Sequence, residues 1–225
     1  MDNLTLNFYQ DQITGFLGHN GAGKTTVTLM LCGIYSPDSG TAHILGHDIG
    51  VDLDSVRSLI GFCPQQNILY DELSVYQHLK LISSLKATIL SSNENIDKQI
   101  DRVSKLVGLD DPLNMSKLAC ELSGGMKRRL CIGMALVGDS RVILLDEPTS
   151  GLDPFHRRSL WDTIRQLKQG RTIILTTHYM EEADALSDRI ALMHHGKVKC
   201  CGSPLFLKVT QINSALSFFH FKLLC

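Results

Sequence analysis

The sequence predicts an α/β fold with an antiparallel β edge and a helical subdomain inserted into the core. Three observations support this prediction. An apolar run at 13–17 leads into a glycine-rich turn and then a helical segment. From residue 141 onward, strand-like and helix-like segments alternate, which is typical of a mainly parallel sheet. Between about residues 73 and 137, apolar residues instead recur every three or four positions, which indicates helices.

The first segments are predicted to form a hairpin that leads into the glycine-rich loop. Leu4, Leu6 and Phe8 alternate with polar residues, as in a half-buried strand, and residues 13–17 supply the second strand. The run TTVTLMLCGI after Lys24 predicts a buried helix that ends at the turn cluster SPDSG. Further strands are expected in TAHIL and in the segment 59–63.

The second half of the chain begins with a helical insert and returns to alternating strands and helices. In the insert, Ile96, Ile100, Val103 and Val107 share one helical face beside the polar stretch SSNEN. The later elements are expected in VILLD, SLWDTIRQL, TIILTT, MEEADAL and RIALM. The single tryptophan, Trp161, is expected to pack in the core from an amphipathic helix.

Composition argues against several classes of function. The 22 Lys and Arg residues nearly balance the 23 Asp and Glu residues, so the net charge of -1 gives no overall reason to expect a nucleic-acid partner. The basic cluster Lys127, Arg128 and Arg129 is interpreted as a solvated helix face. The seven cysteines contain no CxxC pair, so neither a disulfide framework nor a zinc site is indicated. No apolar run approaches the roughly 18 residues needed to span a bilayer.

The loop GHNGAGKTT has the composition of a polyphosphate site. Its glycines let successive backbone N–H groups point inward, and the following helix adds the positive end of its dipole. Lys24 would neutralise the β and γ phosphates, and the Thr25 hydroxyl would bind Mg²⁺. The candidate nucleotide-binding residues here are Gly18, His19, Asn20, Gly21, Ala22, Gly23, Lys24, Thr25 and Thr26.

Two further motifs supply acids and a second anion site. Asp146 ends an apolar strand where a carboxylate can hold hydrated Mg²⁺, and Glu147 follows one pleat step later. In LSGGMKRR, the residues Ser123, Gly124 and Gly125 begin a helix and offer a hydroxyl, free N–H groups and a helix dipole. A chain with one polyphosphate loop needs this second cradle only if it serves a partner's nucleotide, which predicts a head-to-tail dimer.

The order of these motifs resembles the nucleotide-binding domain of ATP-binding cassette transporters, with a P-loop NTPase (RecA-like) core. The resemblance implies that the cofactors are ATP and Mg²⁺. It makes Asp146 the Walker B metal partner and Glu147 the base that polarises the attacking water. Gln65 resembles the Q-loop glutamine that touches Mg²⁺ and the water, with Gln66 as the less favoured neighbour. The remaining implied roles are the γ-phosphate contact of His178 and the contact of Asp153 with the opposite subunit.

The residues in and around these motifs narrow the resemblance to the A subfamily, which is associated with lipid movement. Met126 in the signature, CPQQN around Gln65 and THYMEEAD after the last motif are similar to that subfamily. The implied domain covers 1–208, with a core at about 1–68 and 138–208, a helical lobe at about 69–137, and an apolar tail at 209–225. Its implied partners are a second nucleotide-binding domain, from the same or another cassette, and transmembrane domains supplied by another chain or a missing segment. A transporter would hold it at the cytoplasmic face of a membrane.

Both ends of the chain depart from the family pattern. The adenine-stacking aromatic of the family lies upstream of the first strand, and Tyr9 is too near the loop strand to take that role. We therefore hypothesise a fragment or an alternatively spliced product, which would be cytosolic or peripheral. Two other functions stay open, namely a soluble cassette ATPase that acts on ribosomes or DNA and a catalytically weak regulatory fragment of a transporter. The pair His194–His195 before Gly196 is interpreted as a hairpin turn, with a metal site as the alternative.

Overall fold

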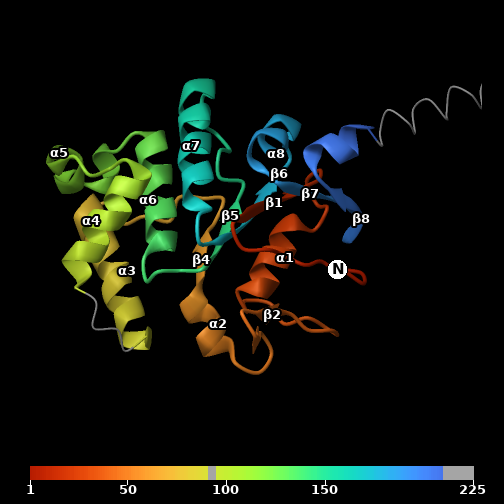
Figure 1. Ribbon diagram of the computed structural model, residues 1–225. Helices are drawn as coiled ribbons and strands as arrows, with labels where there is room; N and C mark the ends of the chain where they lie inside the picture. Colours follow the sequence, from red (N-terminus) through yellow and green to blue (C-terminus); the bar gives the residue numbers. More distant parts are fainter. Residues whose placement is uncertain (91–94, 210–225) are drawn as a thin grey trace, which may run out of the picture.

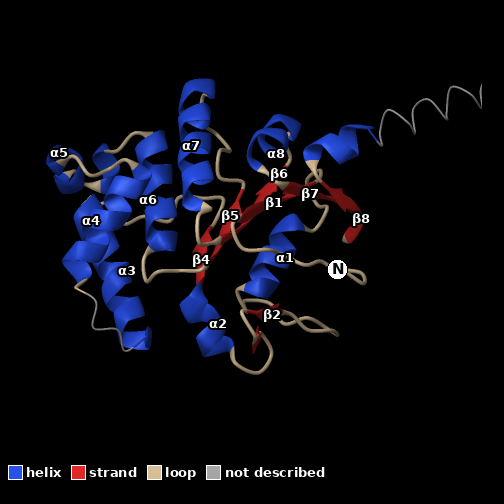
Figure 2. Ribbon diagram, viewed as in Figure 1, coloured by secondary structure: helices blue, strands red, loops and turns tan. Residues whose placement is uncertain are grey.

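A six-stranded sheet forms the centre of the computed structural model, which describes residues 1–90 and 95–209 (Figures 1 and 2). The strand order is β4-β5-β6-β1-β7-β8. All neighbours are parallel except β7 and β8, which pair antiparallel at the edge. The strands are β1 (Gln12–Leu17), β4 (Ile60–Cys63), β5 (Val142–Asp146), β6 (Thr172–Thr177), β7 (Arg189–His194) and β8 (Lys197–Gly202).

The sheet separates the two larger hydrophobic cores of the described residues because side chains alternate between its faces. In β5, Ile143 and Leu145 enter one core, and Leu144 enters the other. In β6, Ile173 and Ile174 divide in the same way. The central strands are therefore buried on both faces, which explains why their sequences are continuous apolar runs.

Helices cover both faces of this sheet (Figure 2). The helices α1 and α2 pack on one side, and α6, α7 and α8 pack on the other (Figure 1). The lobe at the β4 end is built from α3, α4, α5, η1 and α6. The helices are α1 (Lys24–Leu31), α2 (Leu53–Leu59), α3 (Val75–Leu90), α4 (Ile96–Val107), α5 (Pro112–Ser116), the 3-10 helix η1 (Ala119–Glu121), α6 (Gly124–Leu136), α7 (Pro154–Leu167) and α8 (Met180–Leu186).

The lobe is attached to the sheet by a close approach of α6 to β4. A Cβ atom on Gly61 would lie 1.8 Å from the carbonyl oxygen of Ala135, so no larger residue fits there without moving the helix. Leu130 and Ile132 of α6 are fully buried in the same core. Because α6 begins with the LSGGMKRR motif, this packing places the motif relative to the sheet.

The predicted α/β fold and its helical insert are confirmed, but the predicted first strand is wrong. Residues 3–8 form no strand. The strand β1 is already paired on both edges, with β6 and with β7, so segment 3–8 has no free edge to join. Leu4, Leu6 and Phe8 instead pack their side chains against the core beside α1. Their alternation therefore reflects one-sided packing of an extended segment.

Of two other predicted elements, the strand in TAHIL is shorter than expected and the hairpin at His194–His195 is confirmed. Within TAHIL, the strand β2 (His43–Ile44) is two residues long and pairs with β3 (His47–Asp48). The predicted hairpin at His194–His195 is confirmed, because β7 and β8 flank a turn in which His195 and Gly196 have φ angles of 46° and 72°. These left-handed values suit a tight hairpin turn. Of the predicted apolar tail at 209–225, residues 210–225 lie outside the described residues.

No helix within the described ranges has both the length and the apolar character needed to cross a bilayer.

Trp161 is half-buried at the edge of the larger core, and its indole N–H donates to the Glu182 carboxylate over 3.3 Å.

The stability of the fold is predicted to depend on pH through Lys86 in α3. Its Nζ donates to the Ile60 carbonyl at 3.0 Å and to the Ser140 hydroxyl at 2.6 Å. Burial lowers the pKa of Lys86 from 10.5 to about 8. Between pH 8 and 10.5 the unfolded chain therefore binds more protons than the folded chain, so this group makes the free energy of unfolding rise with pH.

We expect the unfolding free energy of the wild type, relative to Lys86→Met, to increase by up to about 3 kcal/mol between pH 7.5 and 10. Urea denaturation at several pH values would measure this difference. Lys80→Met, on an exposed position of the same helix, should give a difference that changes little with pH. A flat profile for Lys86→Met would contradict the prediction.

Candidate functional site

The predicted residues of the glycine-rich loop, together with Gln65, Asp146, Glu147 and His178, meet at the carboxyl end of four adjacent parallel strands. Gly18 follows β1, Gln65 follows β4, Glu147 follows β5 and His178 follows β6. Since β4, β5, β6 and β1 are neighbours in the sheet, their ends converge on one edge. This topology brings together residues that are far apart in the sequence.

The glycine-rich loop after β1 presents free backbone donors. Gly23 has a φ of 102°, a conformation that favours glycine, and α1 begins at the next residue. Within the described residues, the backbone N–H groups of Gly21, Gly23, Lys24, Thr25 and Thr26 meet no backbone or side-chain acceptor. Together with the helix dipole, these donors make a cradle that fits a polyphosphate.

Lys24 lies over this loop with its ammonium group nearly buried. Its Nζ donates to the carbonyl oxygens of Gly18 at 2.7 Å and His19 at 3.2 Å. The same Nζ lies 3.7 Å from Oε1 of Glu147. Only 5 % of the side chain is exposed, so its charge acts in a poorly hydrated environment where phosphate attraction is strong.

Asp146 and Thr25 form an oxygen-rich corner beside the loop. The Thr25 hydroxyl donates to the two carboxylate oxygens of Asp146, at 3.2 and 3.0 Å. The Thr176 hydroxyl also donates to this carboxylate, so Asp146 is oriented from β6 as well as from α1. Hydroxyl and carboxylate oxygens are the ligands that Mg²⁺ prefers, and the arrangement fits that ion.

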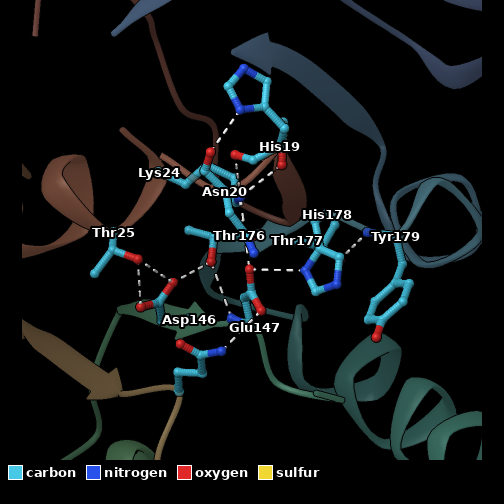
Figure 3. Close-up of polar contacts among 12 residues, drawn as sticks. His19, Asn20, Lys24, Thr25, Asp146, Glu147, Thr176, Thr177, His178 and Tyr179 are labelled. Carbon is cyan, nitrogen blue, oxygen red and sulfur yellow. Dashed lines mark hydrogen bonds and ion pairs between the residues drawn. The ribbon is translucent and has the colours of Figure 1, made fainter. Parts of the chain in front are cut away.

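Glu147 lies at the centre of the contacts drawn in Figure 3. Its Oε2 accepts from the Gln65 amide at 3.1 Å, and its Oε1 lies 3.0 Å from Nδ1 of His178. Because an ionised carboxylate can only accept, His178 donates from Nδ1. The Glu147 side chain is therefore positioned by one residue from the segment after each flanking strand. Gln66, the alternative to Gln65, is exposed and makes no side-chain hydrogen bond among the described residues.

The signature residues lie on the helical lobe, separate from this cluster. Ser123 caps α6 by accepting the Met126 N–H at 3.3 Å, and Ser123 and Gly124 are exposed. Gly125 approaches the ring of His156 in α7. In the part of the chain that the structure describes, no hydrogen bond or ion pair connects these three residues to the glycine-rich loop.

Asp153 lies near the signature and acts locally as a helix cap. Its carboxylate accepts the N–H groups of Phe155 at 3.0 Å and His156 at 3.1 Å. The N–H group and the imidazole of His156 together lower the pKa of Asp153, so the cap stays ionised. The side chain is 54 % exposed, which leaves it accessible from outside the subunit.

The basic cluster after the signature is not the predicted solvated face. Arg128 is 2 % exposed, and its guanidinium donates mainly to backbone carbonyls. Nε donates to the Pro148 carbonyl at 2.7 Å, and Nη2 donates to the Asp146 carbonyl at 2.9 Å. Nη1 donates to the carbonyls of Pro64 at 2.5 Å and Gln65 at 3.2 Å. The physical reason is that α6 is apolar on most sides and therefore lies inside the protein.

The guanidinium of Arg129 also makes hydrogen bonds inside the protein. Its guanidinium donates to the Val107 carbonyl at 2.7 Å, the Ser159 hydroxyl at 2.8 Å and the Thr163 hydroxyl at 3.2 Å. It links α6 to α4 and α7. Two of the three basic residues, Arg128 and Arg129, therefore join elements of the fold and do not form an open surface patch.

Sequence reasoning missed two residues of the site. Thr176 donates its hydroxyl to Asp146, and that hydroxyl also accepts the Glu147 N–H at 3.1 Å. Its position among polar residues that end an apolar strand could have indicated this role. For Arg128, the apolar run LCIGMALV that follows it could have indicated a buried helix.

A nearby thiol is excluded from chemistry. Cys63 ends β4 just before the Gln65 loop, and it is fully buried. Burial raises its pKa to about 12, so the sulfur stays protonated and unreactive at neutral pH.

Comparison with known sequences identifies relatives across most of the chain. Residues 1–150 match the family model described as "ABC transporter". A rat protein named ATP-binding cassette sub-family A member 2 is 51% identical over 208 residues, which are 92% of this chain and 8% of that protein. The human Phospholipid-transporting ATPase ABCA3 is 48% identical over 205 residues, 91% of this chain and 12% of that protein. The chain thus spans a small part of the length of these relatives.

Solved structures share the fold. The cbiO1 protein of Clostridium perfringens, part of the ABC transporter complex cbiONQ, has a TM-score of 0.80 and 28% identity and covers 92% of this chain and 83% of that chain. The ATP-binding cassette MJ0796, solved as a dimer in a post-hydrolysis state with ADP and Pi, has a TM-score of 0.76 and 25% identity, with 88% of each chain covered.

Removing the Arg128 guanidinium should destabilise the chain strongly. Arg128→Met leaves the carbonyls of Pro64, Asp146 and Pro148 without their donor, and each buried unsatisfied group costs about 1–3 kcal/mol. We expect a loss of at least about 3 kcal/mol in the free energy of unfolding, measured by urea denaturation. Lys127→Met on the same helix is the matched control and should change it by less than about 0.5 kcal/mol. Similar losses in both variants would argue against a stabilising role of the Arg128 hydrogen bonds.

Proposed function

The chain belongs to the ABC transporter family, and on this premise we propose that it is an ATP-binding cassette that hydrolyses ATP in a head-to-tail dimer to power transmembrane transport. The cassette would comprise residues 1–208, with the core at about 1–68 and 138–208 and the lobe at about 69–137. The proposed nucleotide contacts are Gly18, His19, Asn20, Gly21, Ala22, Gly23, Lys24, Thr25 and Thr26 from one subunit, and Ser123, Gly124, Gly125 and Asp153 from the other.

The observation that carries this proposal is the position of Glu147. Its carboxylate is held between Gln65 and His178 and lies 3.7 Å from the Lys24 ammonium. A carboxylate fixed beside a polyphosphate cradle can accept a proton from a water molecule that attacks the terminal phosphate. Gln65 and His178 keep it in that orientation. Glu147, Gln65 and His178 are therefore the proposed catalytic group.

The other residues would bind and neutralise the substrate. Lys24 would exchange its contacts with Gly18 and His19 for phosphate oxygens, and the loop N–H groups would bind the remaining oxygens. Thr25, Asp146 and Gln65 would hold Mg²⁺, which supplies positive charge against the charge that develops on the phosphates. Phosphoryl transfer depends mainly on such alignment and charge neutralisation.

The separation of the signature from the loop supports a site shared between two subunits. Ser123 and Gly124 are exposed at the start of α6 and make no polar contact with the loop of the same chain, within the described residues. The related cassette MJ0796 is described as a dimer bound to ADP and Pi. We infer that a second copy or another cassette brings its signature to this chain's ATP.

The transported molecule is proposed to be a lipid. The human relative ABCA3 carries the name of a phospholipid-transporting ATPase, and its identity to this chain is 48%. Membrane domains in another segment or chain would use the closure of the cassette pair, which places this domain at the cytoplasmic face of the membrane. A role on ribosomes or DNA is not supported by the basic cluster after the signature, because Arg128 and Arg129 are engaged inside the fold.

Two substitutions should separate binding from hydrolysis. Lys24→Ala removes the buried ammonium and should weaken ATP binding by at least about 100-fold. Ser123→Arg places a bulky cation at the signature, where it should leave binding by the monomer unchanged and lower phosphate release by about 100-fold or more. Fluorescent-nucleotide titration and phosphate release would measure the two effects, with Lys127→Ala as the control. Equal losses of binding in both variants would exclude a shared site.

The central experiment uses Glu147→Gln to slow hydrolysis and retain the ATP-bound dimer. Light scattering should give a doubling of molar mass when Mg-ATP is added. The double variant Glu147→Gln, Ser123→Arg is the matched control and should stay monomeric, because its signature cannot accept the partner's ATP. Binding of ATP without a change in mass would instead favour a regulatory fragment that needs another cassette.

A further inference from the structure

We propose that His19, His194 and His195 form a binding site for a divalent transition metal, with Zn²⁺ as its occupant. His19 lies in the glycine-rich loop after β1, and the other two residues lie at the turn between β7 and β8. Each of the three imidazoles offers one ring nitrogen, and these nitrogens all lie within 4.8 Å of one another. This site is distinct from the oxygen-rich corner at Asp146.

The three rings already face one another. The ring centre of His19 lies 5.1 Å from that of His194 and 5.6 Å from that of His195. The centres of His194 and His195 are 4.1 Å apart. A tetrahedral Zn²⁺ site with Zn–N bonds of about 2.0–2.1 Å places its ligands about 3.3 Å apart. All three side chains are exposed, so rotation about their own bonds can close the remaining gap.

The hydrogen bond made by the His19 ring suits a metal ligand. Its Nδ1 lies 2.7 Å from the carbonyl oxygen of Asn20, and a carbonyl can only accept, so Nδ1 carries the proton. The lone pair is then on Nε2, the other ring nitrogen. Histidines that bind metals commonly donate their second nitrogen to a carbonyl in this way, which fixes the ring orientation.

The backbone around the cluster is already held at the required spacing. The Gly196 N–H donates to the Ala22 carbonyl at 2.9 Å, which joins the hairpin turn to the glycine-rich loop. A Cβ on Gly18 would lie 2.6 Å from the Met193 carbonyl oxygen, so β7 passes close to the loop. A metal would therefore bridge two segments that the fold has already brought together.

The donor set selects the class of metal. Three neutral imidazoles suit Zn²⁺, Cu²⁺ or Ni²⁺, whereas Mg²⁺ and Ca²⁺ prefer oxygen ligands. A three-histidine set leaves a fourth position for water. The His19 ring points away from the carboxylates of Asp146 and Glu147 (Figure 3). Excess Mg²⁺ should therefore leave Zn²⁺ binding at the imidazoles intact.

The test is a calorimetric titration of the whole chain with Zn²⁺ in excess Mg²⁺ and without nucleotide. The wild type should bind one Zn²⁺ at this site, and His19→Gln and His194→Gln should each weaken that binding at least 10- to 100-fold. The matched control is His43→Gln, an exposed histidine outside the cluster, which should bind as the wild type does. Zn²⁺ at 100 times its Kd should raise the Tm of the wild type by about 5–10 °C, and the rise should vanish in His194→Gln.

Two outcomes would overturn the proposal. One is unchanged Zn²⁺ affinity in His19→Gln and His194→Gln, both checked for native folding by their metal-free melting curves. The other is loss of binding in Cys200→Ser or Cys201→Ser with retention in the histidine variants, since it would assign the metal to thiolates of β8. Co²⁺ substitution distinguishes these ligand sets independently, because thiolate ligands add a charge-transfer absorption that imidazoles lack. All of these readouts are independent of ATP hydrolysis.

Discussion

A buried guanidinium determines how the parts of the candidate site are arranged. Arg128 has no carboxylate partner within the described residues, and its charge is balanced by the carbonyl dipoles of Pro64, Asp146 and Pro148. Removing a cation from water costs several kcal/mol, which is offset only when its donors meet well-placed acceptors. The planar fork of arginine can meet these acceptors at once, which a lysine cannot do. The loop after β4, the end of β5 and the start of α6 must therefore keep one relative arrangement.

That arrangement lets two consecutive acids serve different neighbours. Asp146 is the last residue of β5 and turns towards Thr25 and Thr176. Glu147 has a φ of 44°, a left-handed conformation that costs a residue with a side chain about 1–3 kcal/mol. Its N–H donates to the Thr176 carbonyl at 3.1 Å, and Gln65 and His178 hold its carboxylate, so the surrounding contacts maintain the strained backbone. The strain ends the strand and separates the roles of the two acids.

The sequence was most informative where a motif carries its own local geometry. The glycine loop, the acids at the end of β5 and the histidine after β6 could all be placed because each lies at the end of a strand in one run of residues. Leu4, Leu6 and Phe8 misled because strand formation depends on a free edge of β1, and that edge is taken by residues distant in the chain. The prediction that Arg128 lies on a solvated helix face was wrong for a related reason. Its acceptors come from segments more than 15 positions away, at Pro64 and Pro148. Long-range pairing of this kind leaves little trace in a local pattern.

The antiparallel β7–β8 edge helps to hold the glycine-rich loop in place. The loop after β1 is anchored on one side by β6, through the Gly18 N–H and the Thr177 carbonyl at 3.3 Å. Its other side is anchored by the β7–β8 turn, where the Gly196 N–H donates to the Ala22 carbonyl at 2.9 Å. The loop N–H groups that we propose to bind phosphate do not hold the loop, so its position depends on these neighbours and on the Ala22 N–H, which donates to the His19 carbonyl at 3.1 Å. The same contact brings His194 and His195 to His19, so the turn that supports the glycine-rich loop also forms the imidazole cluster beside it.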